Sequence, residues 1–81
     1  MNIYVGNLSY KMTEYELQQA FGEFGEVESC TIIKDRMTDT SKGFGFVEMP
    51  HDNDARSAIA NLNGKVFDGR KLDVRDASKR R

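Results

Sequence analysis

The stretch "SKGFGFVEM", residues 41–49, sets two phenylalanines between glycines and beside charged residues. In a β-strand alternate side chains point to opposite faces, so Phe44, Phe46 and Glu48 would share one face. Packing that face into a core would bury Glu48 without an evident partner, which is costly. The opposite register buries Val47 and lets neighbouring backbone approach the two glycines closely. We therefore predict a strand with both phenylalanines on an uncovered face.

The run "NIYVG", residues 2–6, repeats this logic near the start of the chain. Its β-branched and aromatic residues, followed by a Gly-Asn turn, predict a second strand. Ile3 and Val5 share one parity and should pack inward, which leaves Tyr4 on the uncovered face. Three exposed rings form an apolar patch that solubility alone would not favour. Three alternatives stay open: the rings cover the sheet, pack on a C-terminal segment, or are buried in a homodimer.

Two amphipathic helices are predicted from apolar residues that recur every three or four positions. The first begins at Thr13, which has the spacing of a capping box with Glu16. The second is capped by Asp52 and stops at Gly64. The apolar positions are Leu17, Ala20, Phe21 and Phe24 in the first helix and Ala55, Ala58, Ile59 and Leu62 in the second.

Two more strands complete the predicted fold, one over residues 27–35 and one around residues 71–75, the latter preceded by a turn at residues 68–69. The element order is then β-α-β-β-α-β. Right-handed crossovers place both helices on one face of a four-stranded antiparallel sheet. The expected fold class is therefore α+β, a ferredoxin-like sandwich with one sheet face covered and the other open.

The composition is that of an ordinary globular domain. Of 81 residues, 38% are hydrophobic and 31% are charged, which suits one domain with one core. No apolar run approaches the length of a membrane span, and the first residues lack the basic start and apolar stretch of a signal peptide. We therefore expect a cytoplasmic protein with no membrane partner.

Residues that usually carry covalent or metal chemistry are scarce. Cys30 is the single cysteine and His51 the single histidine, so the sequence offers neither an internal disulfide nor metal-ligand spacing. We interpret Cys30 as an inert filler on a strand and His51 as a solvent-facing loop residue. The ferredoxin-like arrangement also hosts enzymes, but the turn after residue 6 is not a phosphate-cradling loop. We expect no catalysis, no cofactor and no small-molecule substrate.

Charge is unevenly distributed along a chain whose net charge is −1. Residues 14–28 carry five glutamates and no basic residue, whereas residues 65–81 carry seven basic residues against three acidic ones. A charge run often marks only a solvated face, but a basic end beside a balanced domain also attracts a phosphate backbone.

The sequences of the two strands with the aromatic residues, 2–6 and 41–49, resemble signature segments of a known family. "KGFGFVEM", residues 42–49, resembles the octamer signature of the RNA recognition motif, and "IYVGNL", residues 3–8, resembles its hexamer partner. Met49 stands where the octamer often has Phe or Tyr, at a position of core parity that methionine fills well. The resemblance implies a motif domain over residues 1–77 with a short basic tail at 78–81, similar to small single-domain RNA-binding proteins of bacteria.

Roles for individual residues follow from the resemblance. It implies that Tyr4 and Phe46 each stack beneath a base, that Phe44 packs against sugar rings, and that Lys42 meets a phosphate. For Asn7, at the end of the hexamer, a plain turn role is the alternative to RNA contact. Besides the four residues with a named role, the resemblance implies RNA contact at Asn7, Thr31, Ile33, Asp73, Arg75, Ala77, Lys79 and Arg80.

The function expected from these features is binding of single-stranded RNA by a monomer, in post-transcriptional RNA handling, with modest base preference because stacking tolerates every base. Single-stranded DNA is a close chemical alternative. A different class of function is a protein partner on the helical side, which would meet Glu14, Glu16, Glu23 and Arg56.

Overall fold

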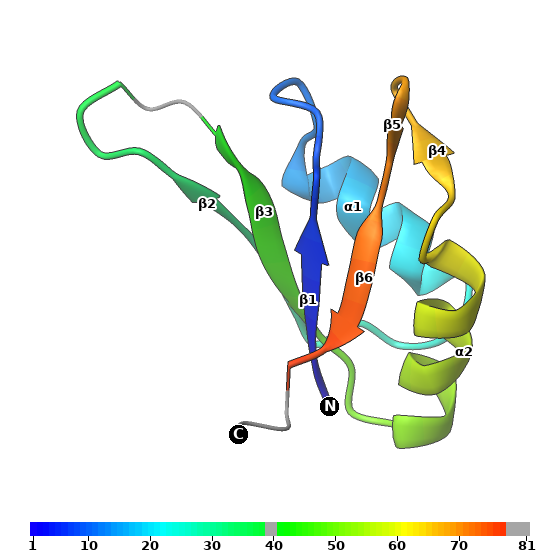
Figure 1. Ribbon diagram of the computed structural model, residues 1–81. Helices are drawn as coiled ribbons and strands as arrows, with labels where there is room; N and C mark the ends of the chain where they lie inside the picture. Colours follow the sequence, from blue (N-terminus) through cyan, green and yellow to red (C-terminus); the bar gives the residue numbers. More distant parts are fainter. Residues whose placement is uncertain (39–40, 78–81) are drawn as a thin grey trace.

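The computed structural model describes residues 1–38 and 41–77, and in these residues a four-stranded antiparallel sheet carries two helices on one face (Figure 1). The strands of this sheet lie in the order β2-β3-β1-β6, so the two strands with the aromatic residues are central. The predicted fold class is confirmed. The elements are β1 (Asn2–Gly6), α1 (Glu14–Gly22), β2 (Ser29–Lys34), β3 (Ser41–Glu48), α2 (Asp52–Leu62), β4 (Val66–Phe67), β5 (Arg70–Lys71) and β6 (Asp73–Asp76).

Helix α1 begins as its sequence predicts. The backbone nitrogen of Glu16 donates to the Thr13 hydroxyl at 3.1 Å, and the backbone nitrogen of Thr13 donates to the Glu16 carboxylate at 3.1 Å. This capping box satisfies two backbone donors that the first turn leaves free. Leu17 and Phe21, on the inner face, are fully buried. Each buried side chain of this size stabilises the fold by about 1.5–3 kcal/mol.

Helix α2 begins differently from the prediction. Its N-cap is His51, whose side chain makes no capping hydrogen bond, and Asp52 is the first helical residue. The prediction that Asp52 caps the helix is wrong, because an aspartate before an apolar stripe also suits the first turn, where it faces the positive end of the helix dipole. The Asp52 carboxylate lies 3.8 Å from the amino nitrogen of Met1. It therefore stabilises this helix end through charge.

The core forms between the inner face of the sheet and the helices, and the predicted strand parity is confirmed. Ile3 and Val5 of β1 and Val47 of β3 are fully buried, and Ile3 pairs with Val47 across the sheet. Gly45, on the same strand, brings β2 and β3 together. A Cβ at this position would collide with the carbonyl oxygen of Thr31. Only glycine therefore permits this approach.

A short hairpin, β4–β5, precedes the last strand of the main sheet. Asp68 and Gly69 form its turn with φ values of 53° and 81°, as a two-residue turn with two positive φ angles requires. The turn was predicted, but the two strands were not. Lys71 pairs with Val66 in this hairpin, so β6 starts at Asp73 and not near residue 71.

In the described part of the chain, no helix has the length and apolar character to cross a bilayer.

Candidate nucleic-acid interface

The uncovered face of the sheet carries three aromatic rings that touch one another, Tyr4 from β1 and Phe44 and Phe46 from β3, which we term the aromatic patch. Ring centroids lie 6.0 Å apart for Tyr4 and Phe44, 5.9 Å for Tyr4 and Phe46, and 6.2 Å for the two phenylalanines. The planes are tilted by 30°, 64° and 88° respectively, within the range of favourable aromatic contacts. All three side chains stay partly exposed. The patch therefore offers apolar surface that the described part of the chain leaves partly uncovered.

Gly6 makes room for the Tyr4 ring. Both residues belong to β1 and share the uncovered face, and Gly6 pairs with Phe44 on one side and Asp73 on the other. A Cβ on Gly6 would lie 2.5 Å from the Tyr4 hydroxyl oxygen and 2.8 Å from two ring carbons. The tyrosine ring therefore lies over the glycine, close to the backbone of the sheet.

One row of the sheet joins four of the predicted contact residues, one from each strand. Phe46 pairs with Thr31 of β2 and with Tyr4, and Tyr4 pairs with Arg75 of β6. Opposite residues in neighbouring strands place their side chains on the same face. A polar residue and a cation thus flank the two central rings of this row.

Arg75 is held by its neighbour on the same strand. Its Nε donates to Asp73 Oδ1 at 2.9 Å, and both side chains are at the surface. This hydrogen bond and the charge of Asp73 raise the pKa of Arg75 above its ordinary value. The guanidinium stays charged beside the aromatic patch, and the carboxylate keeps it close to the sheet.

Asn7 serves the turn after β1. Its φ is 60°, and its Nδ2 donates to the carbonyl oxygen of Lys71 at 2.7 Å. Its Oδ1 accepts from Arg70 at 3.0 Å and 3.3 Å. The turn role that the sequence left open accounts for these contacts, and RNA contact by Asn7 stays a prediction.

The remaining predicted residues differ in how far the structure describes them. Thr31 is exposed and Ile33 is half-buried, and the register between β2 and β3 shifts between Ile32 and Lys34. Ala77 donates its backbone N–H to the carbonyl oxygen of Asn2 at 2.8 Å, which keeps it beside β1. The side chain of Lys42, and residues Lys79 and Arg80, lie outside the described residues.

The structure adds a pair that sequence reasoning missed. The guanidinium carbon of Arg70 lies 5.9 Å from the ring centroid of Tyr10, which follows β1 in the chain. An exposed tyrosine just after the hexamer was the available signal. Its partner lies in a hairpin 60 positions away, and only the tertiary structure brings the two together.

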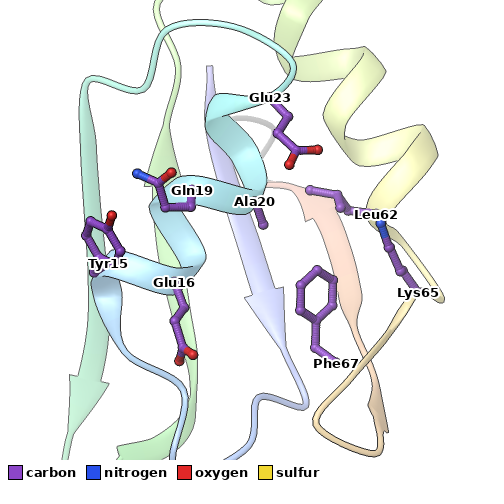
Figure 2. A pocket seen from close by; sticks show the side chains of 8 residues that line it. All are labelled: Tyr15, Glu16, Gln19, Ala20, Glu23, Leu62, Lys65 and Phe67. Carbon is purple, nitrogen blue, oxygen red and sulfur yellow. The ribbon is translucent and has the colours of Figure 1, made fainter.

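The helical side has a hollow of about 330 Å³ beside α1, α2 and β4 (Figure 2). Figure 2 shows Phe67 reaching from β4 toward Ala20 and Leu62, and Lys65 lies with its amino group 5.6 Å from the Phe67 ring centroid. Glu16 and Glu23, which the sequence predicts on the helical side, line this hollow. The helix-face alternative stays a prediction. The hollow is lined by Tyr15, Glu16, Gln19, Ala20, Glu23, Leu62, Lys65 and Phe67.

Side chains that could ligate a metal are scattered over the residues that the structure describes. Within residues 1–38 and 41–77, no three His, Cys, Asp or Glu side chains form a group that could hold a metal ion. Burial, and then the charge of Glu14, raises the pKa of the Cys30 thiol to about 11. His51 is exposed, with Nε2 3.8 Å from the Glu26 carboxylate. The interpretation of Cys30 as an unreactive strand residue agrees with this environment.

Comparison with known proteins gives consistent matches over nearly the whole chain. The model of the RNA recognition motif matches residues 3–73. A relative from Nostoc sp., named "Putative RNA-binding protein RbpD", is 45% identical over 80 residues, which cover 99% of this chain and 85% of that protein.

Solved structures match equally well. The crystal structure of the RNA binding protein PG1 has a TM-score of 0.94 and 51% identity, with 100% of this chain and 98% of that chain covered. The RRM of Rna15, solved with bound RNA (GU), has a TM-score of 0.86 and 29% identity, with 96% and 83% covered. The family model covers most of the sequence, and the sheet carries both signature strands at its centre. The chain belongs to the RNA recognition motif family.

Proposed function

We propose that this protein binds single-stranded RNA on the uncovered face of its sheet. The observation that carries the proposal is the aromatic patch: three partly exposed rings in mutual contact on the uncovered face of the sheet. Unstacked bases lie flat on such rings, and each stacked base contributes about 1–3 kcal/mol with little regard to its identity. The similar RRM of Rna15 was solved with RNA, which supports the proposal.

In this proposal each residue of the interface has a role that follows from its side chain. Tyr4 and Phe46 each stack on a base, and Phe44 packs against the sugars between them. Arg75, charged and held beside Tyr4, meets a phosphate together with Lys42. Thr31 and Asp73 offer hydrogen-bonding groups to base edges at the two sides of the patch, where base preference would arise.

We further propose that residues 1–77 form the RNA-binding domain and that residues 78–81 add positive charge to it. The protein would act as a cytoplasmic monomer in post-transcriptional RNA handling, by binding and without catalysis. The Nostoc relative, 85% of which is covered by the match, is named as an RNA-binding protein, and this supports RNA binding by residues 1–77. Single-stranded DNA, which offers the same base faces, would bind to the same rings.

The test is the affinity for a fluorescently labelled pool of short random RNA, measured by anisotropy. The Phe46→Ala variant should bind more weakly by about 1–3 kcal/mol, because one stacking ring is lost. Tyr15→Ala is the matched control, since Tyr15 is an aromatic residue of α1 that is 71% exposed on the other side of the molecule. A loss below about 0.3 kcal/mol for Phe46→Ala would contradict base stacking on the patch.

A further inference from the structure

Tyr10 is a large side chain that the fold leaves in solvent. It is 65% exposed, yet a guanidinium is fixed over its ring at 5.9 Å from the centroid. The hydrogen bonds from Arg70 to Asn7, and from Asn7 to the backbone of Lys71, hold the arginine in this position. The planar pair is therefore assembled before any ligand arrives, which lowers the cost of ordering it on binding.

Tyr10 lies beside the start of β3, the strand that carries Phe44 and Phe46. The Tyr10 ring carbon Cε1 lies 3.9 Å from the place that a Cβ would occupy on Gly43, the residue before Phe44. The N–H of Leu8 donates to the carbonyl oxygen of Gly43 at 2.8 Å, which joins the loop after β1 to the start of β3. Figure 1 shows this loop and the β4–β5 hairpin at the same end of the sheet. A strand that leaves Phe44 at this end would meet Tyr10.

Charged residues lie near the Tyr10–Arg70 pair and at the other end of the described sheet. Lys11 and Lys71, both exposed, follow Tyr10 and Arg70 in the chain, and the Asp68 carboxylate of the hairpin turn accepts a hydrogen bond from Ser9 at 2.6 Å. The opposite end carries exposed carboxylates where β2 and β3 meet, with the backbone of Glu28 bonded to that of Glu48. The positive charge of Arg70 and Lys71 favours a phosphate near the Tyr10–Arg70 pair.

We propose that Tyr10 and Arg70 form an edge site for one further nucleotide of the RNA strand, beyond those on the aromatic patch. The base stacks on the exposed tyrosine and guanidinium surface, and a phosphate is met by Arg70 or Lys71. A guanidinium and an aromatic ring both present flat surfaces on which a base stacks. This inference rests on the proposed RNA binding and lengthens its footprint at a defined end.

The test is a length series of random single-stranded RNA pools, from dinucleotides to octanucleotides, bound to the wild type and to Tyr10→Ala. Tyr10→Ala should bind the long pools about 5- to 150-fold more weakly and the shortest pools as the wild type does. Tyr10→Phe, which keeps the ring, should bind every length as the wild type does. Circular dichroism melting establishes that each variant is folded.

Two further variants separate the outcomes. Tyr15→Ala, the exposed tyrosine on α1, should leave binding unchanged at every length, whereas Phe46→Ala should weaken it at every length. Equal affinity of Tyr10→Ala and wild type for the long pools would overturn the edge site while leaving the patch intact. A loss of the same size at every length would also overturn it, because Tyr10 would then act through the patch. Absence of binding by the wild type would overturn the proposed function itself.

Discussion

Replacing Gly6 with alanine tests how the aromatic patch is assembled. The new methyl group would lie 2.5 Å from the Tyr4 hydroxyl oxygen and 2.8 Å from two ring carbons, far inside the usual contact distance of about 3.5–4.0 Å between carbon atoms. The methyl group is fixed to the strand, so the Tyr4 ring must move by about 1 Å or more. The ring is free to rotate toward solvent, since it is a side chain on an uncovered face.

The effect on RNA affinity has a ceiling set by the ring that moves. Full loss of one stacked base costs about 1–3 kcal/mol, so Gly6→Ala should weaken binding by up to that amount. Stability should not fall, because Gly6 is not among the glycines with positive φ. At such a position alanine stabilises a protein by about 0.4–1 kcal/mol, since it restricts the unfolded chain. Gly45→Ala offers the contrast: its methyl group would strike the backbone at Thr31, and overpacking of this kind costs about 1–3 kcal/mol of unfolding free energy.

The assay combines RNA binding by anisotropy with urea unfolding for both glycine variants. A double-mutant cycle with Tyr4→Ala then isolates the coupling. In the Tyr4→Ala background, Gly6→Ala should have almost no effect on affinity, because the ring it displaces is already gone. Wild-type affinity of Gly6→Ala, or an equal loss in both backgrounds, would refute the view that Gly6 acts by seating Tyr4.

Three further predictions concern charge, reactivity and stability. If Lys42, Arg75 and the basic tail neutralise about three or four phosphates, a plot of log association constant against log salt concentration should have a slope of about −2 to −3. A slope near zero would mean that these cations do not contact the RNA strand. Alkylation of Cys30 at pH 8, followed by mass spectrometry, should be about 100-fold slower in the native protein than in denaturant. Only the thiolate reacts, and the native fold raises the thiol pKa from its ordinary 9.0 to about 11. Equal rates would place the thiol in open solvent. Thr13→Ala should lower the free energy of unfolding, measured in urea, by about 0.5–2 kcal/mol. RNA affinity should stay unchanged, because the cap lies on α1. Unchanged stability would mean that the capping box contributes nothing.

The sheet could be predicted because its alternatives are costly. One strand parity buries Glu48 and exposes Val47, while the other does the reverse, and the structure follows the second. The same two-residue period put Tyr4 on the face of the phenylalanines. Strand parity therefore predicted the aromatic patch before any contact between distant residues was known.

The start of α2 and the surroundings of the patch could not be predicted in this way. An aspartate before a helix fits either the cap or the first turn, and Asp52 takes the first turn, where it lies near the amino group of Met1. The Arg70 contacts with Asn7 and Tyr10 depend on how a hairpin folds back against a loop some 60 residues earlier. Local patterns carry no information on such contacts.

The most direct test of RNA binding on the sheet is a proton–nitrogen NMR titration of the labelled protein with short random single-stranded RNA. Saturable shifts of the amides of Tyr4, Phe44 and Phe46, with residues 14–23 of α1 unmoved, are the expected result. Shifts confined to α1 and to Arg56 of α2, or no shifts at all, would contradict RNA binding on the aromatic patch.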